Sequence, residues 1–208
     1  ICTNNGERRN YPQGVTLQQV AIDMGFTSGS IYSAYVNNKL KELDYSLFKP
    51  YIVEFIGFSN PEGKRMYDRS LSFVLYKAVH DIFPGKKLKI EHAISKGYYC
   101  EIEGLESVTS EQVAEIEKRM REIIASDMPF VRKRILADDA VKLFEDMGYY
   151  EKAQLFRTRA HLYSSVYHLD DVIDYFYGCL LPSTGYLKLF NIDKYYDGML
   201  LRSPLTEN

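Results

Sequence analysis

The stretch VTLQQVAIDMGF, residues 15–26, has the pattern of a short helix. Thr16 and Gln19 have the spacing of a capping box, in which each side chain binds the backbone N–H of the other residue. Apolar residues recur at helical spacing on one face: Leu17, Val20, Ala21 and Met24. Gly25 then offers a C-terminal cap. The stretch therefore predicts a helix that begins after Thr16 and ends at Gly25.

Strand patterns flank this helix on both sides. Residues 1–14 have the pattern of a hairpin that turns at Asn5-Gly6, and residues 31–43 that of a second hairpin at Asn37-Asn38. The stretch YIVEFIGF, residues 51–58, alternates as a last strand. This order within the first sixty residues predicts a small β-grasp sheet curled over one helix.

The rest of the chain mixes helix and strand patterns. Asn60-Pro61 and Gly63 break local structure and indicate a boundary, after which an amphipathic helix runs to Pro84-Gly85. Further strands are expected at 87–95, 97–104, 131–136, 172–178 and 186–192. A helix is expected at 108–127, where Thr109 and Gln112 have capping-box spacing. Two more helices are expected, one at about 138–148, capped by Asp138 or Asp139, and one at 151–160. We therefore predict an α+β chain with a β-grasp domain at 1–59 and an α+β domain at 60–208.

Composition excludes several classes of protein. The 208 residues are 46% hydrophobic with a net charge of −2, so no overall charge favours nucleic acid or an anionic membrane. Cys2, Cys100 and Cys179 form no CxxC pair, which argues against a disulfide framework and favours a reducing, cytoplasmic setting. No apolar run approaches the ~20 residues that span a membrane. The start at Ile1 and the end at LRSPLTEN lead us to expect a piece of a longer chain.

Common nucleotide and metal motifs do not fit the sequence. In GFSNPEGKR, five residues separate Gly57 from Gly63 and Arg65 follows the lysine, whereas a P-loop needs four residues and then Ser or Thr. The four histidines form no HxxxH or HExxH pair: His80, His92, His161 and His168. The histidine spacing thus predicts no zinc site.

Two parts of the sequence resemble parts of threonyl-tRNA synthetases. NNGERRNYPQGVTLQQVA, followed by YVNNKLKELDYSL, resembles the TGS domain, a β-grasp module that these synthetases share with some GTPases and stringent-response enzymes. Residues 69–104, 109–135 and 175–192 resemble the second, editing-type domain of threonyl-tRNA synthetase. Together the two resemblances cover nearly the whole chain.

The resemblance implies a degenerate editing site. Editing domains carry HxxxH on the long helix and CxxxH near the domain end, as a metal-binding set. Here these positions, together with an acidic position two residues before the cysteine, are occupied by Arg69, Phe73, Tyr177, Cys179 and Ser183. Only Cys179 matches a ligand, and a single thiolate does not hold zinc at useful affinity. The resemblance therefore implies a pocket without metal and without catalytic residues.

The same pair of domains, with a degenerate site, resembles the N-terminal region of bacterial uridine kinase-like proteins. We therefore expect a non-catalytic accessory region that senses a ligand or RNA, with a P-loop kinase domain of the same chain beyond residue 208. This expectation implies ATP and magnesium for the parent kinase and no cofactor in these residues. The expected ligands are a nucleotide, an amino acid or a tRNA, and no membrane.

Two alternatives stay open. One is a divergent metal-free aminoacyl-tRNA deacylase, or a threonyl-tRNA synthetase-related fragment, and a deacylase of this kind would use Cys179, Ser183 and His168. The other is a binding module in which a small anion or nucleotide is held near Arg69, Tyr98, Cys179 and Ser183. A guanidinium suits a phosphate or carboxylate ligand, and it equally suits an ion pair with a nearby acid such as Asp68 or Asp174.

Overall fold

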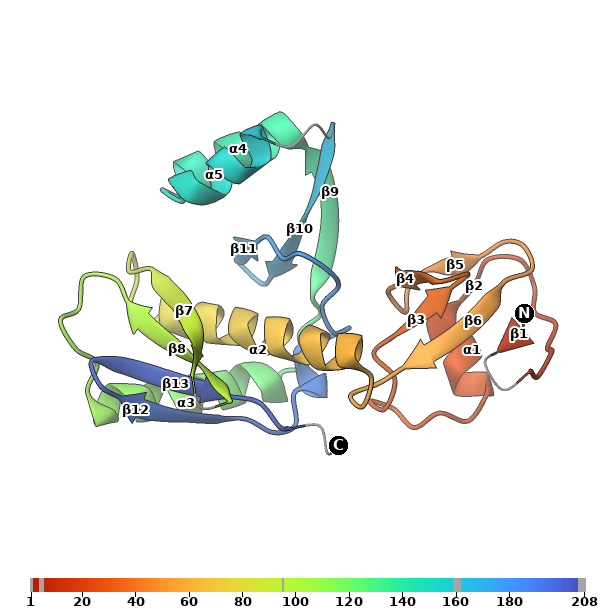
Figure 1. The fold of residues 1–208 in the computed structure, drawn as a ribbon, viewed down its shortest axis with the longest axis horizontal. Coiled ribbons are helices and arrows are strands. Elements are labelled where there is room, and N and C mark those ends of the chain that lie inside the picture. The colour runs from red at the N-terminus through yellow and green to blue at the C-terminus, as the bar shows by residue number, and fades with distance from the viewer. Residues whose placement is uncertain (1, 4–5, 95, 159–161, 206–208) are drawn as a thin grey trace. The chain divides into compact units, whose positions relative to one another are not determined.

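The computed structural model describes residues 2–3, 6–94, 96–158 and 162–205, and the chain forms two compact units (Figure 1). Unit 1 comprises residues 1–129 and 178–208, and unit 2 comprises residues 130–177. Both units combine helices with antiparallel strands, so the chain is a mixed α+β protein, as the sequence predicts. The domain boundary near residue 59 stays a prediction. Among the described helices, none is long and apolar enough to cross a membrane.

The N-terminal part of unit 1 is a mixed sheet with one helix. The sheet order is β1 (Cys2–Thr3), β6 (Ile52–Ile56), β3 (Ser33–Val36) and β4 (Lys39–Lys41). Strands β1 and β6 are parallel and the other neighbours are antiparallel, while β2 (Val15–Thr16) pairs with β5 (Ser46–Leu47). Helix α1 (Leu17–Asp23) contributes to the core of this part through its apolar face.

Local signals place α1 and the second hairpin correctly. The capping box of Thr16 and Gln19 is formed, and the β3–β4 turn has positive φ at Asn37 and Asn38. The first hairpin, expected at residues 1–14, stays a prediction: β1 pairs with β6, and Arg8 also forms a β-bridge. Asn5, in the expected turn, lies outside the described residues.

Helix α2 (Pro61–Ile82) begins earlier than the sequence predicts. The Asn60 side chain caps it by accepting from the Glu62 N–H at 2.9 Å, and Pro61 occupies the first helical position, where its missing N–H costs nothing. Gly63 lies inside the helix rather than before it. A Cβ at Gly63 would lie 1.9 Å from the Gly57 carbonyl oxygen, so glycine lets the helix approach this loop closely.

The remainder of unit 1 is a four-stranded antiparallel sheet with α2 and α3 (Ser110–Ala125). The strand order is β12 (Asn191–Tyr195), β13 (Gly198–Arg202), β8 (Gly97–Ile102) and β7 (Leu88–Ile94). The predicted capping box of α3 is confirmed. The strand predicted at 186–192 is wrong in most of its length, since η1 (Thr184–Tyr186) precedes β12. The backbone of Leu189 does not pair with another strand, because the Tyr67 hydroxyl accepts from its N–H and donates to its carbonyl oxygen.

Unit 2 is a three-stranded antiparallel sheet with two short helices. Strands β11 (Val172–Asp174), β10 (Tyr163–Leu169) and β9 (Val131–Leu136) are neighbours in that order, and the helices are α4 (Ala137–Asp146) and α5 (Tyr150–Arg157). The Phe144 and Phe156 rings stack at 5.4 Å between centroids in the core. The prediction that Asp138 or Asp139 caps α4 is wrong, because both lie in its first turn and Leu136 is the N-cap residue.

Candidate functional site

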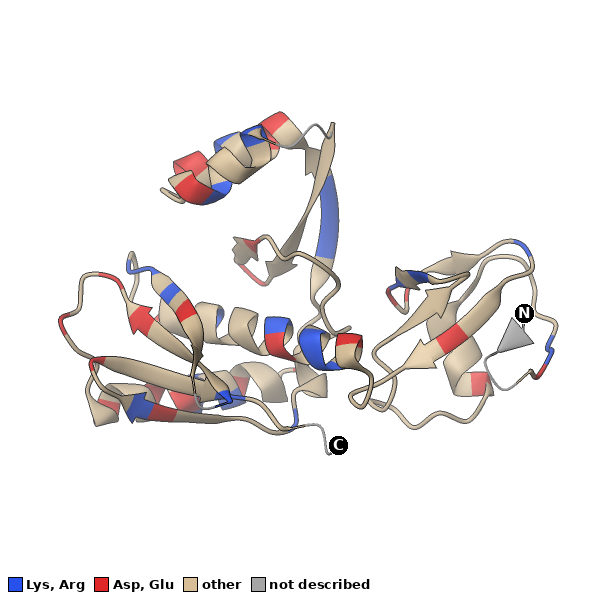
Figure 2. Cartoon of the chain, viewed as in Figure 1, with Lys and Arg blue, Asp and Glu red and all other residues tan. Residues whose placement is uncertain are grey.

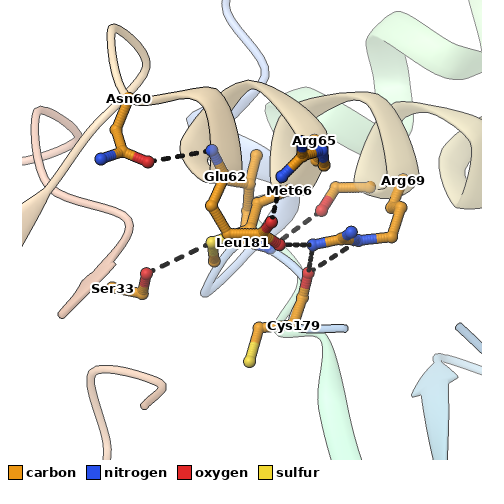
Figure 3. Close-up of polar contacts among 9 residues, drawn as sticks. Ser33, Asn60, Glu62, Arg65, Met66, Arg69, Cys179 and Leu181 are labelled. Atoms are coloured by element: carbon orange, nitrogen blue, oxygen red, sulfur yellow. Dashed lines mark hydrogen bonds and ion pairs between the residues drawn. The ribbon is translucent and has the colours of Figure 1, made fainter. Parts of the chain in front are cut away.

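Arg69, near the middle of α2, joins this helix to the segment that begins at Gly178. Its Nη2 donates to Glu62 Oε1 at 2.6 Å, and its Nε and Nη2 donate to the Cys179 carbonyl oxygen at 3.1 and 2.9 Å (Figure 3). The side chains of Arg69 and Glu62 are only 19% and 17% exposed. Arg69 therefore forms an ion pair, but its partner is Glu62. Asp68 instead pairs with Lys64, and Asp174 with Lys152.

The Glu62 carboxylate is shared between two cations. Its second oxygen accepts from Arg65 Nη1 at 2.9 Å. Burial raises the pKa of Glu62, but the hydrogen bonds from Arg69 and Arg65 outweigh burial and the net pKa is lowered. Glu62 is therefore ionised at neutral pH and balances the charge that Arg69 brings to the site.

Gly178 lies against the Arg69 guanidinium. A Cβ at this position would lie 2.8 Å from Arg69 Cζ, and the backbone φ of +119° is one that residues with a side chain rarely adopt. Glycine therefore gives the guanidinium room to reach the Cys179 carbonyl.

The side chains at the four positions that the resemblance aligns with metal ligands do not suit a metal ion. Figure 3 shows the Cys179 carbonyl oxygen directed at Arg69 and its Sγ directed away. Phe73 is fully buried and offers no lone pair, and an arginine stays protonated in proteins. Zinc needs converging N, S or O ligands in deprotonated form. The residues present do not fit this requirement.

The segment after Cys179 is held by contacts with α2, with α3 and with the residues that follow α3. The Leu181 N–H donates to Ser70 Oγ on α2 at 2.8 Å. Ser183 Oγ donates to Asp127 Oδ1 at 2.5 Å, beyond the end of α3. Thr184 Oγ1, which is buried, donates to the Ile123 carbonyl oxygen at 2.8 Å and accepts from the Met128 N–H at 2.9 Å.

Thr184→Val is expected to lower the free energy of unfolding by about 1–2 kcal/mol. Valine has nearly the same shape, but it leaves the half-buried Met128 N–H and the buried Ile123 carbonyl without the hydroxyl. Urea unfolding followed by circular dichroism measures the loss. Thr158→Val, at an exposed hydroxyl that donates only to the Leu155 carbonyl, is the control and is expected to change stability by less than about 0.5 kcal/mol. If Thr184→Val and Thr158→Val lowered the free energy of unfolding equally, the Thr184 hydrogen bonds would not be important for stability.

The remaining candidate residues are placed separately. Tyr98 on β8 is half-buried. Burial raises its pKa, the negative charge of Asp68 raises it further, and the positive charge of Arg69 lowers it. Tyr98 is therefore close enough to Arg69 to be affected by its charge. Tyr177 ends unit 2 and is 84% exposed. His168 lies on β10 of unit 2, where burial and Lys133 lower its pKa. His161 lies outside the described residues. The geometry thus joins Arg69 and Cys179, and a ligand pocket at these positions stays a prediction.

No protein-family model matches the chain. The chain is similar to threonine–tRNA ligases. The ligase of Syntrophomonas wolfei is 30% identical over 194 residues, which cover 92% of this chain and 31% of that protein. The ligase of Desulforamulus reducens is 33% identical over 191 residues, or 90% and 30% of the two chains. The ligase of Marinobacter nauticus is 30% identical over 196 residues, or 93% and 31%. The chain spans about three tenths of the length of these curated relatives.

The expected uridine kinase-like parent is wrong. Threonine–tRNA ligases match about nine tenths of this chain, so the comparisons favour the alternative of a threonyl-tRNA synthetase-related fragment. The comparisons support neither a kinase domain as partner nor a nucleoside kinase function. Differences from an expected ligand set do not show which catalytic domain belongs to a chain. No comparison tests the expectation about ATP and magnesium.

Proposed function

We propose that this chain is a tRNA-contacting segment related to threonyl-tRNA synthetase, composed of a TGS-like and an editing-like part, and that it does not hydrolyse misacylated tRNA. The observation that carries the proposal is the set of hydrogen bonds made by Arg69. A guanidinium stands where the resemblance requires the first histidine ligand, and it is bound by Glu62 and the Cys179 carbonyl. The similarity to threonine–tRNA ligases supports the link to tRNA.

Three properties of the site argue against metal-dependent hydrolysis. The Arg69 charge repels a divalent cation, and the carboxylate that pairs with it, Glu62, already binds two arginines. The Phe73 ring is fully buried and occupies the place of the second histidine. The Cys179 thiol is directed away from Arg69. We accordingly propose that the segment works without a bound metal.

The test uses the 208-residue chain with threonine tRNA. We expect binding with a Kd of about 1–100 μM near physiological salt, because an RNA contact without base recognition falls in this range. We expect no deacylation of misacylated threonine tRNA above the spontaneous rate, with or without added Zn²⁺. Filter binding measures the first quantity, and release of labelled amino acid measures the second.

Cys179→Ala separates the proposal from the metal-free deacylase. Arg69 contacts the backbone carbonyl of Cys179, so this variant keeps the contact and is expected to match the wild type in both assays. Hydrolysis that Cys179→Ala abolishes would establish the deacylase instead. Absence of tRNA binding by the wild type, even at low salt, would contradict the proposed function.

A further inference from the structure

Two adjoining hollows form a groove on the surface of the N-terminal part of unit 1. Their volumes are about 190 and 380 Å³, and Asn10 and Pro50 line both. The walls are formed mainly by residues between β1 and β2 and by residues between β5 and β6. We call this surface, comprising residues 8–13, 15, 37 and 47–52, the N-terminal groove. Because the two hollows share residues, one continuous ligand can occupy both.

The N-terminal groove contains basic residues and no acidic ones. Figure 2 shows basic residues on both loops that form its walls. The acidic residues of the first 59 positions lie outside it: Glu7, Asp23, Glu42, Asp44 and Glu54. One of the groove cations is balanced by the protein, because Arg9 pairs with Glu7 at 2.7 Å and with Asp23 at 3.0 Å. Arg9 is therefore not counted as a ligand-binding charge.

Arg8 and Lys49 carry the other two positive charges, one in each hollow. Both residues are exposed. Within the part of the chain that the structure describes, neither side chain forms an ion pair with a carboxylate. The Lys49 ammonium lies 5.7 Å from the centroid of the Tyr51 ring, a contact that does not cancel its charge. The groove is thus locally cationic in a chain whose net charge is −2.

The groove also presents an exposed aromatic ring. Phe48 is 62% exposed, although its side chain is large and apolar. The ring lies against Gly14, because a Cβ on this glycine would be 3.6 Å from Phe48 Cε1. Asn10 and Gln13, which are both exposed, add amide donors and acceptors. A ring that the backbone supports on one side and that stays open elsewhere can stack on an unpaired base.

An ordinary loop surface explains each of these features singly but not their combination. Exposed cations and isolated apolar side chains are common on proteins. Here two cations without carboxylate partners and an exposed ring line one hollowed surface that has no acidic residue. Single-stranded nucleic acid has the matching chemistry, because negative phosphates and flat bases repeat along one chain. An anionic membrane also attracts cations and apolar rings, but its broad surface suits a groove less well than a strand does.

We propose that the N-terminal groove binds an unpaired strand of RNA, with Arg8 and Lys49 on phosphates and Phe48 stacked on a base. This inference rests on the proposed function and names the surface through which the segment contacts tRNA. The two cations supply affinity that does not depend on sequence, because they contact phosphates. Phe48 favours unpaired over paired regions of the RNA, because a base within a duplex is already stacked.

The first test compares Arg8→Gln/Lys49→Gln with the wild-type chain on threonine tRNA and on an oligouridylate of about 12 nucleotides, a length within the usual site sizes. Loss of two phosphate contacts is expected to weaken binding about 10- to 100-fold at low salt and to reduce the slope of log K against log salt by about 1.4. Phe48→Ala is expected to weaken binding about 5- to 100-fold with little change in slope, because stacking releases few counterions. Circular dichroism checks that the variants remain folded.

Phe48→Trp gives a direct readout of stacking, because the chain contains no tryptophan. The single indole is expected to keep RNA affinity within about threefold of the wild type and to lose fluorescence when either RNA binds, since every base offers a flat face to an aromatic ring. Unchanged fluorescence at saturating RNA would overturn the stacking role of Phe48. A blue shift with phosphatidylserine vesicles, without quenching by RNA, would overturn the RNA proposal in favour of a membrane surface.

Matched controls lie outside the N-terminal groove. Lys39→Gln/Lys118→Gln removes the same charge from exposed positions, and Ile22→Ala truncates an apolar side chain that is 67% exposed. Each is expected to change affinity by less than about threefold. If the wild type binds tRNA and the groove variants bind with the same affinity and slope, the groove proposal is overturned and the proposed function stands. If the wild type binds no tRNA, the proposed function itself fails, and the groove proposal fails with it.

Discussion

Asp81→Asn is expected to lower the free energy of unfolding by about 3 kcal/mol, because it removes the carboxylate from a largely buried ion-pair cluster. Asp81, on α2, accepts from Lys77 Nζ at 2.6 Å and from Arg119 of α3 at 2.9 and 2.8 Å. Lys77 is only 3% exposed. Asparagine keeps the shape of the side chain but removes the charge that balances these cations. Urea unfolding at pH 7, followed by circular dichroism, measures the loss.

Glu122→Gln is the control for Asp81→Asn. Glu122 also pairs with Arg119, at 3.0 Å, but 48% of its side chain is exposed. Solvent screens this pair, so its loss is expected to cost less than about 0.5 kcal/mol. Adding Lys77→Met to Asp81→Asn should recover part of the stability, because the buried ammonium is then removed as well. Equal losses for the two single variants would show that the buried cluster is not coupled to folding.

The Asp81 effect also has a defined pH dependence. Burial raises the pKa of Asp81, but the hydrogen bonds from Lys77 and Arg119 outweigh burial and the net pKa is lowered. A carboxyl whose pKa is lowered by folding stabilises the protein fully above its ordinary pKa of about 3.9, and this contribution is lost as the pH falls through the folded-state pKa. The difference in free energy of unfolding between the wild type and Asp81→Asn is therefore expected to stay constant from about pH 7 to 5 and to become smaller below about pH 4.

Elements with strong local signals were predictable from the sequence. The capping boxes at Thr16 and Thr109 fix the starts of α1 and α3, because both partners lie within one helical turn. The start of α2 was missed because Asn60-Pro61 suits both a break and a helix beginning. The strand predicted at 186–192 failed for a different reason. Its backbone is held by the Tyr67 hydroxyl, 122 residues away from Leu189, and no local pattern reveals such a contact.

The site itself was only partly predictable. The resemblance aligned Arg69 and Cys179 with ligand positions, and the structure does bring them together, but through the cysteine carbonyl rather than the thiol. Glu62 was missed as the partner of Arg69, although it lies seven residues earlier on the same face of the same helix. The roles of Ser70 and Thr184 could not be predicted, because their partners are distant in the sequence. Ser70 accepts from the N–H of Leu181, 111 residues later, and Thr184 donates to the carbonyl of Ile123, 61 residues earlier.

Arg69→Met is expected to lower the free energy of unfolding by about 2–3 kcal/mol, because it removes the partly buried guanidinium that bridges Glu62 and the Cys179 carbonyl. Methionine keeps much of the side-chain stem, so lost packing contributes little. We also expect amide hydrogens at residues 179–181 to exchange faster, since this segment loses one of its links to α2 and keeps the bond from the Leu181 N–H to Ser70. Urea unfolding measures the first effect, and hydrogen exchange with mass spectrometry measures the second.

Arg65→Met makes the test specific, because Arg65 pairs with the same carboxylate but is 64% exposed. It is expected to cost less than about 0.5 kcal/mol and to leave exchange at 179–181 unchanged. If Arg69→Met behaved like Arg65→Met, Arg69 would be an ordinary surface cation that does not hold the Cys179 segment to α2. A loss of stability confined to Arg69→Met would instead show that Arg69 holds the Cys179 segment against α2.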